Sequence, residues 1–160
     1  MSYGRDILAE GKAPITMYHQ VYKAIWERHS LTGFTDESAF WRRVFEVLSP
    51  GERAFVLAHE FFCSFSEGGY DGYFFEGDGF TRARAAVQAF RHVGLTQAAD
   101  CLQKAIEVAA IPDALPEGYE YASPKSGLEE AGQAYRKARR SEDFEGSLVN
   151  YFKQHVEEFA

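Results

Sequence analysis

Apolar residues recur at intervals of three and four along most of the chain, which is the spacing of one face of an α-helix. The same spacing predicts a helix that begins near residue 15 and ends before Gly33, and further helices over residues 36–48, 50–66, 81–93, 96–110, 126–140 and from 141 onward. No stretch of useful length alternates as a strand would. The sequence therefore predicts an all-α fold, a single-domain bundle of seven or eight helices.

The two ends of this pattern differ from its middle. Residues 1–14 are interrupted by Gly4, Gly11 and Pro14 and predict a loosely held N-terminal arm, although Ile7 and Leu8 could dock on the body. Residues 15–160 are predicted to form one all-helical domain. Within it, residues 111–124 hold three of the five prolines and predict the longest connection, an ordered surface loop.

Several helix starts carry recognisable capping residues. Ser49 and Glu52 have the spacing of a capping box, with Pro50 in the first turn. Ser126 repeats that spacing with Glu129, while Thr96 and Ser141 are predicted to open the two remaining C-terminal helices. Gly94 is predicted to end the helix over residues 81–93.

The least ordinary stretch is FSEGGYDGYFFEGDGF, residues 65–80, which contains five glycines and four carboxylates and no Lys, Arg, His or Pro. Paired glycines are typical of positive φ or of a close backbone approach, so Gly68 and Gly69 predict a tight reversal. The helix over residues 50–66 is apolar on most sides near its end and is expected to lie centrally. A short buried helix should follow the reversal, with Tyr73 and Phe74 in the core.

Composition and charge narrow the classes of protein. The 160 residues include 26% charged residues and five prolines, which is typical of a folded domain. A net charge of -7 disfavours direct binding to nucleic acid or to anionic membranes, so a neutral or basic protein is the expected macromolecular partner. The N-terminus lacks a signal-peptide pattern and no apolar run is long enough for a membrane span, so we expect a cytoplasmic protein.

The titratable residues suggest no catalytic or metal centre. His59 and Glu60 are adjacent and point about 100° apart on a helix, and the other histidines are scattered. Cys63 and Cys101 are expected to be buried reduced thiols. The carboxylates of the unusual stretch do not have the spacing of a calcium loop and are expected to cap the turn or to pair with Arg82 or Arg84; they are Glu67, Asp71, Glu76 and Asp78. We predict no enzyme activity, no metal and no cofactor.

The unusual stretch and the helix after it, ending HVGLTQAADCLQKAIEVA, resemble the signature of a bacterial domain-of-unknown-function family that includes a DNA-mimic protein. The family motif reads Asn-Gly-Gly-Phe-x-Gln-Tyr-Phe, and the likeness spans roughly residue 55 to the C-terminus. Its eight positions are occupied here by Glu67, Gly68, Gly69, Tyr70, Asp71, Gly72, Tyr73 and Phe74, and Gly79 is a further glycine that matches the family. Glu67 replaces the usual Asn and Gly72 the usual Gln, so a polar site built from those two amides would be altered.

The resemblance implies an acidic protein that binds a DNA-binding protein or transcription regulator by presenting carboxylates in place of phosphates. Residues 1–48 hold six acidic and six basic residues, whereas residues 49–160 hold 18 and 11. The candidate interaction residues are three acidic pairs: Glu129 and Glu130, Glu142 and Asp143, Glu157 and Glu158. An immunity-type or adaptor protein that does not imitate DNA is the alternative. An enzyme or small-ligand binder at the glycine-rich stretch is a third hypothesis, and a homo-oligomer stays open.

Overall fold

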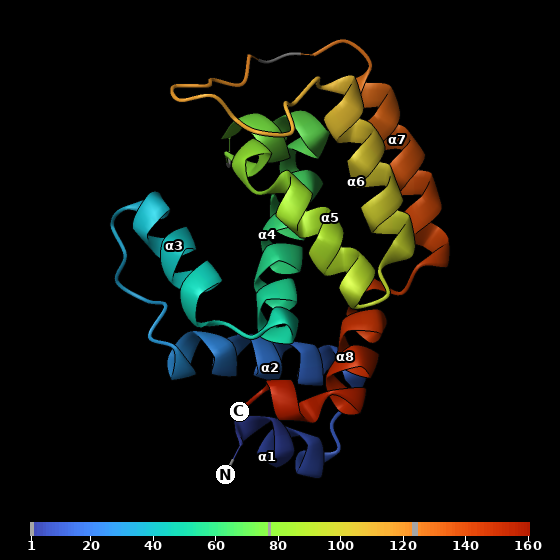
Figure 1. The fold of residues 1–160 in the computed structure, drawn as a ribbon. Helices are drawn as coiled ribbons and strands as arrows, with labels where there is room; N and C mark the ends of the chain where they lie inside the picture. Colours follow the sequence, from blue (N-terminus) through green and yellow to red (C-terminus); the bar gives the residue numbers. More distant parts are fainter. Residues whose placement is uncertain (1, 77, 123–124) are drawn as a thin grey trace. The chain divides into compact units, whose positions relative to one another are not determined.

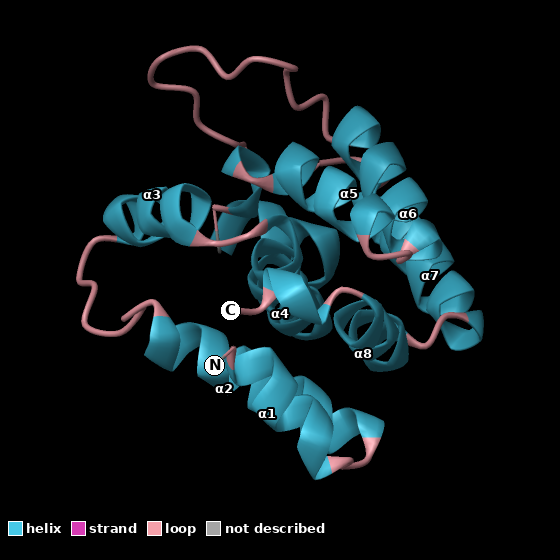
Figure 2. Ribbon diagram, turned by 60° about the horizontal axis from the view of Figure 1, so that its bottom comes forward, coloured by secondary structure: helices cyan, strands magenta, loops and turns pink. Residues whose placement is uncertain are grey.

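The computed structural model describes residues 2–76, 78–122 and 125–160, and these residues form eight α-helices and no strand (Figures 1 and 2). The predicted all-α fold is confirmed. The α-helices are α1 (Tyr3–Glu10), α2 (Pro14–Arg28), α3 (Glu37–Val47), α4 (Pro50–Asp71), α5 (Ala83–His92), α6 (Thr96–Val108), α7 (Leu128–Ala138) and α8 (Phe144–Gln154). None of the described helices combines the length and apolarity that a bilayer span requires.

Contacts divide the chain into two compact units, and neither boundary coincides with a shift in composition. The first unit comprises Met1–Val56 and Phe144–Ala160, and the second comprises Leu57–Asp143. One boundary falls inside α4 and the other directly before α8. The sequence analysis predicted a single domain over residues 15–160, because an uninterrupted helical pattern crosses both boundaries.

In the first unit, the N-terminal residues form a docked helix where the sequence predicted a loosely held arm. α1 packs against α2 and against the 3-10 helix η4 (Val156–Glu158), and α2 packs against α8. The carbonyl oxygen of Phe159 accepts hydrogen bonds from the Gly4 nitrogen at 3.0 Å and the Ser2 hydroxyl at 2.9 Å. A Cβ on Gly4 would lie 2.8 Å from that oxygen, so the glycine that suggested a loose arm is what permits the close approach.

In the second unit, α5 packs on α6 and α6 on α7, over a core rich in aromatic rings. Phe61 on α4 lies at its centre, with ring centroids 5.0 Å from Tyr73, 5.3 Å from Phe90 and 5.6 Å from Tyr135. These four side chains are fully buried. The expected central position of this part of α4 is therefore confirmed within its own unit.

Three predicted helix starts differ from the structure. α8 begins at Phe144, whereas Ser141, which was predicted to open this helix, is the last residue of the 3-10 helix η3 (Arg139–Ser141). α7 begins at Leu128 with Gly127 as its N-cap and no side-chain capping bond, so Ser126 and Glu129 do not form the predicted capping box. α6 begins at Thr96, which is therefore its first helical residue and not its cap. The stop at Gly94 is confirmed by a φ of 83°, and most of the predicted loop over 111–124 is irregular, with residues 123 and 124 outside the described ranges.

Neighbouring phenylalanines offer a matched test of the core. Phe74 is fully buried, whereas Phe75 is 53% exposed. We expect Phe74→Ala to lower the free energy of unfolding by about 3 to 5 kcal/mol and Phe75→Ala to change it by less than about 0.5 kcal/mol. Urea denaturation of both variants measures the difference, and equal losses would contradict the assignment of Phe74 to the core.

Candidate functional site

The paired glycines produce a kink inside α4. Gly69 has φ 64° and ψ -155°, which interrupts the helical geometry of α4, while Gly68 keeps helical angles. The predicted positive φ is thus confirmed at one of the two glycines. The helix continues past the kink to Asp71 and then into a π-helical turn, η1 (Gly72–Glu76), in place of the expected reversal and short α-helix.

The aromatic residues of the motif lie beneath this kink and not on the surface. Tyr70 lies 4.9 Å from Phe65 and stacks on Phe74 at 5.9 Å between ring centroids. Tyr70 and Tyr73 are buried, and their hydroxyl groups have no hydrogen-bond partner among the described residues. Burial raises the pKa of both phenols, so both stay neutral.

The last glycine of the motif, Gly79, serves packing. It is buried, and a Cβ there would collide with the backbone carbonyl and ring of Tyr73. Gly72 is also buried. Tyr73, Phe74, Gly72 and Gly79 therefore form a structural half of the motif.

The other half of the motif lines a hollow of about 360 Å³ in the second unit, between the end of α4 and the start of α7. We call it the motif pocket. It is lined by charged and glycine residues, including Glu67, Gly69, Asp71, Glu129, Gly132 and Arg136. The sequence analysis named residues 67–71 from the motif and Glu129 from its acidic pair; it missed Leu128, Gly132 and Arg136.

The charges in the motif pocket are not paired with one another. Asp71 accepts a hydrogen bond from the hydroxyl of Tyr121 at 3.1 Å. Arg136 lies over the ring of Phe65, with its guanidinium carbon 5.2 Å from the centroid, and has no ion pair with a described residue. Glu67 and Glu129 are exposed and have no hydrogen bond or ion pair within the described residues. Three carboxylates against one guanidinium leave the pocket acidic.

The two arginines that follow the motif pair with other carboxylates than those predicted. Arg82 is buried and forms an ion pair with Glu60 of α4, with Nε 3.1 Å from Oε1. Arg84 lies 3.0 Å from Asp113 and donates to the carbonyl of Ile111 at 2.7 Å. The predicted pairing with Asp78 is replaced by these contacts, and the side chain of Glu76 lies outside the described residues.

The prediction that both cysteines are buried is wrong for Cys63, which is exposed on α4, and Cys101 is half-buried. Both are free thiols. The pKa of the Cys63 thiol is raised, mainly because its sulfur is partly desolvated and to a smaller extent because the Glu67 carboxylate is near. The thiolate is therefore disfavoured, although the residue as a whole is exposed. Among the described residues, no group of three His, Cys, Asp or Glu side chains is placed to hold a metal ion, and we assign no metal ligands.

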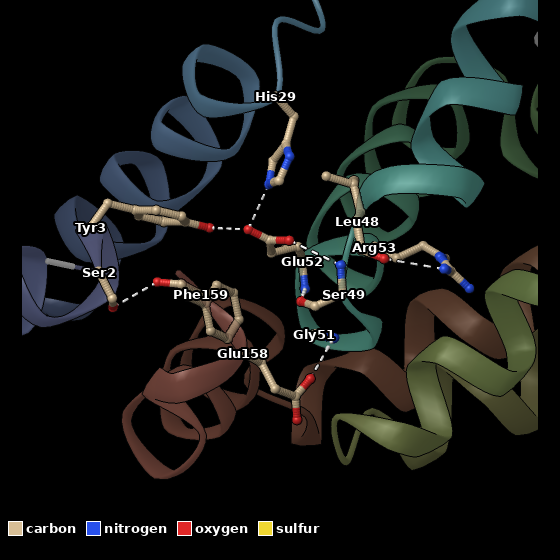
Figure 3. A network of polar contacts seen from close by, with 10 residues as sticks. All are labelled: Ser2, Tyr3, His29, Leu48, Ser49, Gly51, Glu52, Arg53, Glu158 and Phe159. Carbon is tan, nitrogen blue, oxygen red and sulfur yellow. Dashed lines mark hydrogen bonds and ion pairs between the residues drawn. The ribbon is translucent and has the colours of Figure 1, made fainter.

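Two of the six candidate acidic residues cap helices. Glu142 accepts hydrogen bonds from the backbone nitrogens of Gln97 at 2.7 Å and Ala98 at 3.0 Å, the first turn of α6. Glu158 accepts a hydrogen bond from the Gly51 nitrogen at 2.8 Å, in the first turn of α4 (Figure 3). It accepts another from the Tyr151 hydroxyl at 2.6 Å.

The remaining four candidates are exposed. Glu129 and Glu130 lie in the first turn of α7 without a partner among the described residues. Asp143 precedes α8, and Glu157 lies 3.8 Å from the Nδ1 of His155. Glu129 and Glu130 are thus the acidic pair most available to a binding partner.

A buried carboxylate, Glu52, joins three helices of the first unit (Figure 3). It is 2% exposed, and its Oε1 accepts from the hydroxyl of Tyr3 at 2.6 Å and lies 2.9 Å from Nε2 of His29. The predicted capping box is confirmed: the Ser49 nitrogen donates to Oε2 at 3.0 Å and the Glu52 nitrogen to the Ser49 hydroxyl at 3.2 Å. Burial, reinforced by the bond to Glu52, raises the pKa of Tyr3 and keeps its phenol a donor.

Most of the chain, including the motif and the motif pocket, matches a known protein family. A family model described as DMP19-like protein matches residues 46–155. The chain belongs to the DMP19-like protein family. No curated protein and no solved structure matches it. The DMP19-like region includes the whole motif pocket and Glu142, and it leaves out α1, α2 and most of α3.

The kink in the DMP19-like region can be tested at its two glycines. An alanine Cβ at position 69 would meet only Arg136, at 3.6 Å, so its cost is backbone strain. We expect Gly69→Ala to lower the free energy of unfolding by about 1 to 3 kcal/mol. Gly68→Ala should leave it unchanged or raise it by up to about 1 kcal/mol, because that residue is helical. Thermal denaturation of both variants measures the difference in stability. Equal losses of stability would show that the positive φ of Gly69 is not required.

The cap of α4 can be tested at adjacent glutamates. We expect Glu158→Ala to destabilise the fold by about 1 to 3 kcal/mol, since the Gly51 nitrogen and the Tyr151 hydroxyl lose a charged acceptor. Glu157→Ala should cost less than about 0.5 kcal/mol, because its ion pair is exposed. Chemical denaturation provides the measurement, and a loss confined to the Glu157 variant would refute the capping role.

Proposed function

We propose that this DMP19-like protein binds a DNA-binding protein and occupies that partner's DNA site with carboxylates. The observation that carries the proposal is a group of acidic side chains beside the motif. Glu67, Glu129 and Glu130 have no partner among the described residues. Glu67 and Glu129 line the motif pocket together with Asp71. Family membership and the net charge of -7 support it.

Charge favours the second unit as the binding surface. Residues 57–143 hold 14 acidic and nine basic residues, a difference of five, whereas the first unit holds ten and eight. A protein that binds duplex DNA presents basic side chains to one phosphate charge per roughly 1.7 Å of helix axis. Carboxylates on the surface of the second unit can form ion pairs with those basic side chains. The proposed role is non-catalytic, and we expect a cytoplasmic protein.

A protein interface without DNA mimicry is the second candidate function, and basic residues on and after α7 favour it. Arg136 lies in the motif pocket itself, and Arg139 lies over the ring of Phe62 at 5.6 Å. Lys137 and Arg140 add two further positive charges in the same region. An adaptor or immunity-type protein would use both signs of charge, whereas a DNA mimic would use the carboxylates.

Three binding experiments distinguish the two candidate functions: a rise in salt concentration, competition by duplex DNA, and reversal of charged residues. A partner captured from the host extract should bind more weakly as salt rises and should be displaced by duplex DNA if the carboxylates replace phosphates. Reversal of Glu129 and Glu130 to Lys should weaken binding at least tenfold. Reversal of Asp6 and Glu46 in the first unit, which makes the same change in net charge, is the control and should have a smaller effect.

Circular dichroism checks that each reversed variant keeps its helical content. Glu142 and Glu158 are left intact because they cap helices. A captured partner that ignores both salt and competing DNA, and that tolerates the reversal at 129 and 130, would reject mimicry in favour of the second candidate.

A further inference from the structure

A second hollow, of about 490 Å³, lies in the first unit where the loop after α2 meets the start of α3. Its lining includes the aromatic residues Trp26, Phe34 and Phe40 and the acidic residues Asp36 and Glu37. We call it the aromatic hollow. It lies outside residues 46–155, so it is not part of the region shared with the DMP19-like family.

The three rings are held as a connected cluster. Phe40 stacks on Trp26 with ring centroids 5.2 Å apart and planes 26° apart, and Phe34 meets Phe40 edge-on at 5.9 Å and 73°. Phe34 is 40% exposed, although a phenylalanine gains stability from burial. An aromatic surface is therefore presented to solvent by rings that their neighbours hold in place.

The carboxylate of Asp36 retains capacity to accept further hydrogen bonds. Asp36 caps α3 by accepting from the Ser38 nitrogen at 3.0 Å, and it has no ion pair with a described residue. Glu37 accepts from the indole nitrogen of Trp41 at 3.4 Å. An ionised carboxylate offers about four acceptor positions, so the contact with the Ser38 nitrogen leaves Asp36 able to accept more hydrogen bonds.

Aromatic faces beside the carboxylate of Asp36 match one common side chain. We propose that the aromatic hollow receives an arginine side chain of the protein partner. A guanidinium stacks flat on an aromatic face while its N–H groups donate to a carboxylate. A lysine ammonium is a compact, strongly hydrated charge that gains less from stacking on a ring. A neutral apolar side chain would donate no hydrogen bond to the carboxylate of Asp36.

The inference rests on the proposed function for the origin of the arginine. Proteins that bind DNA carry arginines for phosphate and guanine contacts, so a partner displaced from DNA offers such side chains. Because the hollow lies outside the family-matched region, it would add selectivity that belongs to this chain.

The direct test uses three short peptides that differ at one residue: acetyl-Gly-Arg-Gly-amide, its lysine analogue and its citrulline analogue, which keeps the shape of arginine without the charge. Each is titrated into the full-length ¹⁵N-labelled protein. The arginine peptide should produce saturable shifts in the indole signal of Trp26 and in backbone amides from Phe34 to Phe40. The citrulline peptide should bind at least tenfold more weakly, and the lysine peptide should also bind more weakly than arginine.

Variants separate the ring from the charge. Phe34→Ala should reduce binding of the arginine peptide at least fivefold, and Asp36→Asn should reduce it while preserving the cap of α3, because Asn caps as well as Asp. Phe75→Ala, which removes an exposed ring of the second unit, is the matched control and should bind normally. Absence of saturable shifts, equal binding of the citrulline peptide, or normal binding by Phe34→Ala would overturn the proposal.

Failure of this proposal and failure of the proposed function give different results. If the arginine peptide binds as expected but duplex DNA does not displace the captured partner, mimicry fails and the arginine site stands. If DNA displaces the partner while the peptide does not bind, mimicry stands and the arginine site fails. When both succeed, Phe34→Ala should also weaken capture of the partner, and unchanged capture would show that the hollow is not used in the complex.

Discussion

The buried carboxylate of Glu52 is the constraint on which the first unit depends. The N-terminus of a helix leaves backbone donors without intrahelical partners, and burying them without acceptors is costly. Glu52 and Ser49 satisfy donors at the start of α4, and Glu158 satisfies the nitrogen of Gly51. Glu52 also accepts a hydrogen bond from the Tyr3 hydroxyl and contacts His29, so α1 and the end of α2 are both held at the start of α4. One carboxyl group therefore determines where three helices meet.

At its other end α4 is governed by a backbone constraint, the positive φ of Gly69. The kink directs Tyr70, Tyr73 and Phe74 into the core, and it leaves Glu67 and Gly68 beside the motif pocket. Burial of the rings and exposure of the carboxylates are therefore two results of one backbone conformation. This division explains why aromatic, glycine and acidic residues alternate so densely in a short stretch.

Sequence reasoning succeeded where the interacting residues are close in the chain. The capping box of Ser49 and Glu52, the stop at Gly94 and the buried Tyr73 and Phe74 all follow from spacing of a few residues. It failed where the partner is distant: α6 is capped by Glu142, about 45 residues further on, and Gly4 is held by the carbonyl of Phe159. Six residues of the motif pocket were named from motif or charge, but Arg136 gave no signal, because its position over Phe65 is set by tertiary packing.

The same capping contacts change how the acidity of the chain bears on function. Glu52, Glu60, Glu142 and Glu158 are engaged by internal donors, so the formal charge of -7 overstates what a partner meets as open carboxylate. The open carboxylates at Glu67, Glu129 and Glu130 would attract a basic surface over several ångströms but are strongly screened by salt. A stacked arginine in the aromatic hollow would lose less to screening, because part of its interaction is with the rings. Long-range attraction and short-range selectivity would then be carried by chemically different parts of the chain.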